Sequence, residues 1–280
     1  MKKNFSWPDN SKCAVMMSFD IDGETTWANG NKGHKNGENY LKSLSIGQYG
    51  PKRCVENILE LLTENNIKAT FFVPGFIVEK YPQLMKKIVS YGHEIGHHGY
   101  KHERFYDKTY EEQVEIIDKS QEIFQRVIGK KAVGFRTPSG DWAEFTPKLL
   151  IEKGFKYSSS MRGTDSPYRT IIDGSATDFI EIPTKWELDD YVQMAYNLFP
   201  AEPAGQGRIS GYDNVFENFK WEFEGYYDRG LSISYMFHPQ VIGTPGRLRL
   251  LENLIKEIKS KGDVWFATGS EISDWVRKTI

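Results

Sequence analysis

The chain has 280 residues, of which 39% are hydrophobic and 26% are charged. This composition is typical of a globular protein and excludes disordered, collagen-like and coiled-coil classes. The 36 lysines and arginines nearly balance the 38 aspartates and glutamates, giving a formal net charge of −2. That balance gives no reason to expect nucleic acid or an anionic membrane as a partner.

Membrane and disulfide signals are missing from the sequence. No apolar run reaches the ~18 residues that a membrane-spanning helix needs, and the first residues lack the apolar stretch of a secretory signal. The two cysteines, Cys13 and Cys54, are too few for a disulfide framework. We therefore expect reduced thiols and a cytoplasmic location.

Strands and helices alternate along the chain. Residues 13–19 form a continuous apolar run, which is typical of a buried parallel strand. Further strands are predicted at 69–73, 93–97, 132–135, 155–159, 179–182, 232–237 and 264–267. Helices are predicted at 51–65, 77–91, 110–129, 146–154, 215–227, 248–261 and 272–278. Strand-then-helix order predicts a parallel sheet with helices outside, and seven or eight such units favour a (β/α) barrel over an open sheet.

Two long segments, 28–50 and 168–211, break this rhythm. Long loops in compact domains are usually functional or interfacial. Aromatic residues, which are enriched where proteins meet partners, occur in both segments. We expect the segments to pack over the barrel mouth or against another subunit through Tyr40, Tyr49, Trp186, Tyr191 and Tyr196.

Two clusters of chemically capable residues follow predicted strands. His98 and His102 are four apart, and a helical turn there would point both imidazoles the same way, as metal ligands require. A solvated polar loop is the alternative. Asp20 and Asp22 are two apart at the end of the first strand and so point to one side of it. A helix-capping and a turn aspartate would be the structural explanation.

Two more strands end in polar residues, Arg136 and His238. In a barrel the carboxyl ends of the strands carry the active site. The two histidines with one aspartate would form a His₂Asp metal site with an open position, the pattern of catalytic rather than structural sites.

Together these motifs resemble those of the NodB-homology polysaccharide deacetylases, carbohydrate esterase family 4. They are similar, more narrowly, to the allantoinase-like branch with cytosolic peptidoglycan deacetylases and cyclic imidases. The resemblance rests on Ser18-Phe19-Asp20-Ile21-Asp22-Gly23, His98-Gly99-Tyr100-Lys101-His102, Arg136-Thr137-Pro138-Ser139 and Tyr235-Met236-Phe237-His238. It implies one domain over residues 1–280, folded as a distorted (β/α)7–8 barrel.

The resemblance also implies roles for the site residues. Asp20 would be the general base, oriented by Arg136, and His238 the general acid. Asp22, His98 and His102 would hold a divalent metal, with zinc as the default and Fe, Co and Ni also suiting such ligands. The fourth family motif is altered at 157–161, so the carboxylate partner of His238 is not assigned. The expected substrate-binding residues are Glu24, Trp27, Pro138 and Trp186.

The function implied is a metal-dependent amide hydrolase that removes N-acetyl groups from amino sugars of peptidoglycan or a related glycan. Hydrolysis of a cyclic imide or amide is the alternative, since the same chemistry serves both. A non-catalytic carbohydrate-binding relative is disfavoured, because no base or ligand is lost. The partners expected are a glycan or small-molecule substrate and further copies of the chain, with a tetramer implied by the resemblance.

Overall fold

The protein is built around a single β-sheet with helices packed against it. The structure is a computed structural model, which describes residues 6–195 and 209–280. Its strands are β1 (Cys13–Asp20), β2 (Thr70–Val73), β3 (Glu94–His97), β4 (Gly134–Phe135), β5 (Tyr157–Ser158), β6 (Tyr168–Ile172), β7 (Ser175–Glu181), β8 (Ser232–Phe237) and β9 (Val264–Phe266). They pair in the order β6-β7-β5-β4-β3-β2-β1-β8, and β9 also pairs with β1. All of these pairs are parallel except β6 with β7, which confirms the predicted parallel sheet.

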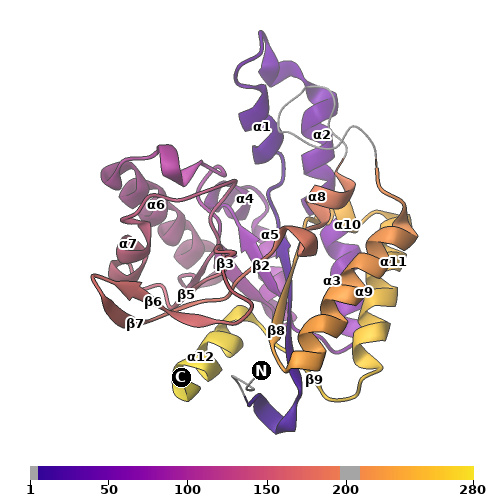
Figure 1. The fold of residues 1–280 in the computed structure, drawn as a ribbon. Helices are drawn as coiled ribbons and strands as arrows, with labels where there is room; N and C mark the ends of the chain where they lie inside the picture. The colour runs from indigo at the N-terminus through magenta and orange to yellow at the C-terminus, as the bar shows by residue number, and fades with distance from the viewer. Residues whose placement is uncertain (1–5, 196–208) are drawn as a thin grey trace.

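Helices surround the sheet on both sides (Figure 1). They are α1 (Thr25–Asn31), α2 (Leu41–Tyr49), α3 (Val55–Glu64), α4 (Gly75–Lys80), α5 (Pro82–Ser90), α6 (Tyr110–Ile128), α7 (Thr146–Glu152), α8 (Asp190–Met194), α9 (Tyr212–Arg229), α10 (Pro239–Ile242), α11 (Pro245–Lys259) and α12 (Gly269–Thr279). Short helical turns are η1 (Pro8–Asn10), η2 (Gly37–Asn39), η3 (Gly50–Cys54), η4 (Phe105–Asp107) and η5 (Trp186–Leu188). In Figure 1, α4, α6 and α7 lie on one side of the sheet and α3, α9 and α11 on the other, while α1 and α2 project beyond it. None of the described helices is long and apolar enough to cross a bilayer.

Strand β1 shows how the two faces of the sheet differ. All eight of its residues are buried. The alternate residues Cys13, Val15, Met17 and Phe19 join the large core beneath the helices. The others point to the inner face, where Ala14 and Met16 belong to a second apolar cluster and Ser18 and Asp20 follow by alternation. The inner face therefore changes from apolar to polar toward the carboxyl end of β1.

Helix α12 packs over the amino end of this inner face. The backbone N–H of Gly269 donates to Thr70 Oγ1 at 2.9 Å, at the first residue of β2. A Cβ on Gly269 would lie 2.3 Å from the Tyr157 hydroxyl oxygen, so no larger residue fits without movement. Helix α12 thus closes the amino end, which buries apolar residues and a few hydrogen-bonded polar groups such as Thr70, and the charged groups that line the cavity gather at the opposite end.

Three sequence predictions need correction. The helix predicted over 77–91 is two helices, α4 and α5, because Pro82 cannot continue a helix and begins the second one instead. The long segment 28–50 contains most of α1 and all of α2. The long segment 168–211 begins with an antiparallel hairpin, β6–β7, which was not predicted as a unit. Tyr196 lies outside the described residues.

Candidate active site

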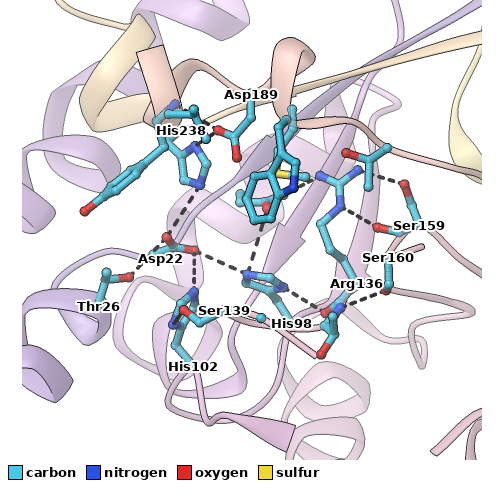
Figure 2. Close-up of a pocket in the computed structure, with 18 of the residues that line it drawn as sticks. Asp22, Thr26, His98, His102, Arg136, Ser139, Ser159, Ser160, Asp189 and His238 are labelled. Carbon is cyan, nitrogen blue, oxygen red and sulfur yellow. Dashed lines mark hydrogen bonds and ion pairs between the residues drawn. The ribbon is translucent and has the colours of Figure 1, made fainter. Parts of the chain in front are cut away.

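A cavity of about 500 Å³ opens at the carboxyl end of the sheet. The ends of four strands supply polar side chains to it: Asp20, His98, Arg136 and His238. The structure thus brings together residues that are far apart in the sequence, as the predicted strand-end clustering requires. Figure 2 shows His98, Arg136 and His238 pointing toward the centre of this pocket.

Asp22, His98 and His102 place three metal-ligating atoms within 4.8 Å of one another. His98 Nε2 lies 3.5 Å and His102 Nε2 lies 3.6 Å from Asp22 Oδ1. That oxygen is buried and accepts no hydrogen bond; a buried carboxylate oxygen without a donor is unusual and suits a cation ligand. His98 Nδ1 lies 2.8 Å from the Arg136 carbonyl oxygen, which fixes the ring with Nε2 toward Asp22.

The protonation state of His98 also suits a metal ligand. Burial lowers the pKa of His98 to about 4, so its imidazole is neutral at pH 7, as metal binding requires. Thr26 Oγ1 donates to the second oxygen of Asp22 at 3.1 Å and so orients the carboxylate. These three side chains therefore fit a His₂Asp metal centre with room for further ligands.

The two histidines meet through a tight turn, and the predicted helical geometry is wrong. Gly99 (φ +72°) and His102 (φ +60°) both have left-handed backbone conformations, so the segment is not a right-handed helical turn. The turn still brings the two ring centroids to 5.0 Å from each other. The Glu103 carboxylate accepts the backbone N–H groups of Tyr100 at 2.9 Å and Lys101 at 2.8 Å. These bonds hold the turn, and a non-glycine residue in the left-handed region is strain often found at functional sites.

Arg136 fixes Asp20 in the ionised state. The guanidinium donates to Asp20 Oδ1 at 2.7 Å and to Ser18 Oγ at 2.9 Å. Its other nitrogens donate to the carbonyl and hydroxyl oxygens of Ser159, both at 2.9 Å. Burial by itself raises the pKa of Asp20, but the charge and hydrogen bond of Arg136, together with the charges of His98 and His238, outweigh it, and the net shift is downward. Asp20 is therefore a buried anion, 3.9 Å from His98 Nε2.

His238 is paired with a carboxylate from α8. Its Nδ1 lies 2.8 Å from Asp190 Oδ1, and its backbone N–H donates to the same carboxylate at 3.0 Å. Asp189 Oδ1 is farther from Nδ1, at 3.6 Å. Burial alone lowers the pKa of His238, but the hydrogen bond and charge of Asp190 raise it to about 10. The ring is therefore protonated at neutral pH, with Nε2 3.9 Å from Asp22 Oδ2.

The four predicted substrate-binding residues lie in different places. Trp186 lines the cavity. Glu24 lines a neighbouring cavity and forms an ion pair with Lys80. Trp27 is buried in α1, and Pro138 lies next to Gly99. Contact of all four with substrate stays a prediction.

Asp190 and Ser159 were not singled out from the sequence. Adjacent carboxylates at positions 189 and 190 were a usable signal, since paired acids are common at catalytic sites. Their link to His238 depends on a bridge between Asp189 and Met236 of β8, which local sequence does not encode. Tyr191, predicted as a loop aromatic, lies with its ring centroid 5.2 Å from that of His238.

Comparison with known proteins shows similarity to polysaccharide deacetylases. The family model for polysaccharide deacetylases matches residues 48–158. A solved Mycobacterium smegmatis structure, named for the polysaccharide deacetylases, is 32% identical, covers 99% of this chain and 94% of its own, and has a TM-score of 0.91. A peptidoglycan deacetylase of Helicobacter pylori is 29% identical over 93% of this chain and 94% of its own length.

An allantoinase structure shares the fold, with a TM-score of 0.82 at 22% identity over 98% of this chain and 93% of its own. The similarity of these structures over nearly the whole chain confirms the predicted fold class. The chain therefore belongs to the polysaccharide deacetylase family and is a hydrolase acting on carbon–nitrogen bonds.

Proposed function

We propose that this enzyme is a metal-dependent deacetylase that removes N-acetyl groups from amino sugars of peptidoglycan or a related glycan. The observation that carries the proposal is the placement of two oppositely charged groups beside one candidate metal centre. The Asp20 carboxylate contacts this centre at His98, and the protonated His238 ring contacts it at Asp22, each at 3.9 Å. The peptidoglycan deacetylase relative from Helicobacter pylori supports the choice of glycan.

Hydrolysis of an acetamide needs two proton movements. A water oxygen bonds to the acyl carbon while the carbon–nitrogen bond breaks. Asp20 accepts the proton that the water loses, and His238 Nε2 donates a proton to the leaving nitrogen. Arg136 keeps Asp20 anionic and in place, and Asp190 keeps His238 protonated. The products are acetic acid and the free amine, so the atoms balance.

Asp22, His98 and His102 would hold the divalent metal. When bound, it supplies Lewis acidity to the acyl oxygen and to water. Two nitrogens and one carboxylate oxygen suit zinc, which we propose as the native metal, although Fe, Co and Ni accept the same donors.

A side-by-side assay of the metal-loaded protein tests the function. The substrates are N-acetylglucosamine oligomers, muropeptides, succinimide, hydantoin and allantoin. We expect acetate release from the glycans, and its loss after chelation with recovery on adding metal. Turnover of the cyclic amides alone would replace the proposal with the cyclic imide or amide alternative. Hydrolysis of none of them by protein with full metal content would contradict both.

Two further expectations stay predictions. The chain is expected to form a homo-oligomer, with a tetramer implied by the family resemblance, and to be cytoplasmic. Light scattering that gives a monomer at micromolar concentration would contradict the first.

A further inference from the structure

Arg162 is a cation in the cavity wall that forms no ion pair within the part of the chain the structure describes. One terminal nitrogen donates to the Ser160 carbonyl oxygen at 3.2 Å. Its Nε is buried and has no hydrogen-bond partner. Arg136, in the same cavity, uses all three of its nitrogens within the protein. The Arg162 side chain is partly buried, but its Nε is buried, and a buried donor normally has a partner, so the unused donors of Arg162 point to a ligand.

The Arg162 guanidinium is held in place by stacking and not by an ion pair with a described residue, although the charges of Asp189, Asp141 and Asp20 act on it. It stacks on the Trp186 ring, with its central carbon 3.8 Å from the ring centroid. Lys185 Nζ donates to the Arg162 carbonyl oxygen at 2.9 Å and fixes the backbone beside it. A guanidinium stacked by its face keeps its N–H groups in the plane, at the edge, where they match the two oxygens of a carboxylate.

Charge in the cavity is divided between two kinds of residue. Asp20, Asp22 and Asp189 supply the carboxylates, while Arg162 and Arg104 supply cations that pair with none of them. Arg104 is exposed, whereas burial lowers the pKa of Arg162 and marks it as the more desolvated of the two. An anionic substituent would be repelled by the carboxylates and attracted to Arg162, and this would orient the substrate.

We propose that Arg162 binds a carboxylate carried by the substrate, so that the enzyme prefers amides bearing a carboxylate to neutral ones. This inference rests on the proposed amide hydrolysis and adds its substrate class. An acidic amino sugar and a small acidic cyclic amide both offer this carboxylate. Trp186 provides an apolar face beside the charge, which suits a sugar or a ring.

The test compares each acid with its own methyl ester, which removes the charge and keeps the amide. One pair is an N-acetylmuramic acid disaccharide and its ester, and the other is hydantoin-5-acetic acid and its ester. We expect the wild type to prefer the acid of one pair by about 10- to 100-fold in kcat/KM, mainly through KM, the usual effect of a charge-assisted hydrogen bond. The pair that shows the preference identifies the source of the carboxylate.

Arg162→Gln should remove the preference, so that kcat/KM for the acid falls to the level of the ester in the same variant, and its circular dichroism and metal content should match those of the wild type. Arg162→Lys should restore part of the preference, because it restores charge without the planar fork. Arg104→Gln is the matched control and should leave the preference intact. Equal rates on acid and ester in the wild type, or a preference that survives in Arg162→Gln or disappears in Arg104→Gln, would overturn the inference.

A binding measurement separates this inference from the proposed function. If the wild type hydrolyses neither these pairs nor the substrates named under the proposed function, the amide hydrolysis is wrong, but calorimetry with the two acids still measures whether Arg162 binds their carboxylate. Tighter binding of an acid than its ester by the wild type, lost in Arg162→Gln, would uphold the carboxylate site. Equal binding of acid and ester would reject it.

Discussion

The two ends of the sheet's inner face differ in chemistry although the same strands build both. At the amino end, Ala14, Met16 and Tyr157 pack in an apolar cluster that α12 covers. At the carboxyl end, Asp20 and Arg136 lie buried beside a cavity. Buried charges cost folding free energy and apolar packing supplies it. The closed end therefore stabilises a scaffold on which the polar end can carry charges that would not pack stably alone.

Loss of a metal ligand should have the largest effect at the polar end. His98→Ala or Asp22→Ala should weaken metal binding by at least about 10²-fold and remove activity with it, because a three-ligand site loses one ligand. Metal content measured by mass spectrometry, alongside acetate release, checks this. His34→Ala changes an exposed histidine outside the cavity and is the matched control. Full metal occupancy in both ligand variants would refute the ligand assignment.

Removal of the proposed base should separate chemistry from metal binding. Asp20→Asn keeps the shape of the side chain but accepts a proton poorly. We expect kcat to fall by about 10²–10⁴-fold with metal content retained. If Asp20→Asn lost as much metal as His98→Ala, Asp20 would instead be a metal ligand.

The pairing of His238 with Asp190 predicts a shift in the pH profile. A general acid must be protonated, so activity is lost as pH rises through its pKa. Asp190 raises the pKa of His238 to about 10 against the opposing effect of burial. Asp190→Asn should therefore lower that pKa and move the alkaline limb of kcat/KM toward neutral pH. Asp189→Asn, at 3.6 Å rather than 2.8 Å, should move it less, and an unmoved limb in both variants would argue against His238 as the acid.

Glu181, at the polar end, should make the unfolding free energy depend on pH, an effect smaller than the losses of activity described above. It ends β7, and its carboxylate accepts the backbone N–H groups of Ser160 and Met161 at 2.6 and 2.8 Å. Burial raises the pKa of Glu181 from 4.5 to about 7. Because the folded state holds the proton more tightly, this contribution to stability is full below pH ~4.5 and is lost as pH rises to ~7.

The loss amounts to about 3 kcal/mol. Glu181→Gln should flatten this part of the dependence of unfolding free energy on pH, as measured by denaturant titration at several pH values. Arg136 and Tyr168, the other titratable groups that interact with Glu181, remain in the variant. An unchanged pH dependence would show that the Glu181 carboxylate is not the source.

A substitution at the closed end should change the stability of the protein and not its catalytic rate. We therefore expect its effect on activity to be the smallest. Gly269→Ala places a methyl group against Tyr157 and should lower the free energy of unfolding by about 1–2 kcal/mol. The kcat of the folded variant should be unchanged. Gly225→Ala lies in α9 with only ordinary contacts and should be neutral or stabilising. A large fall in kcat for Gly269→Ala would mean that the two ends are coupled.

Local sequence patterns predicted the strands and placed at their ends the residues that line the cavity, for a physical reason. The buried run of β1 and the aspartates that follow it are encoded within ten residues, as are the polar residues Arg136 and His238 after their strands. The turn at His98–His102 was predicted as helical because a four-residue spacing is the same in a helix and in a turn that contains left-handed residues. The pairing of Asp190 with His238 joins segments 48 residues apart, and no local pattern carries that contact.

The position of β1 in the sheet has a consequence for folding during synthesis. Strand β8, which pairs with six residues of β1, comes from residues 232–237. Strand β9, which pairs with the first three residues of β1, comes from residues 264–266. While the chain emerges from the ribosome, β1 can pair only with β2, over three residues near its end. The edge of β1 that pairs with β8 stays open until most of the protein has been made. Asp20 and Asp22 therefore cannot join His238 in one site until β8 has been synthesised. A nascent chain therefore spends most of its synthesis with an unpaired apolar strand edge, a surface on which chaperones act and at which aggregation begins.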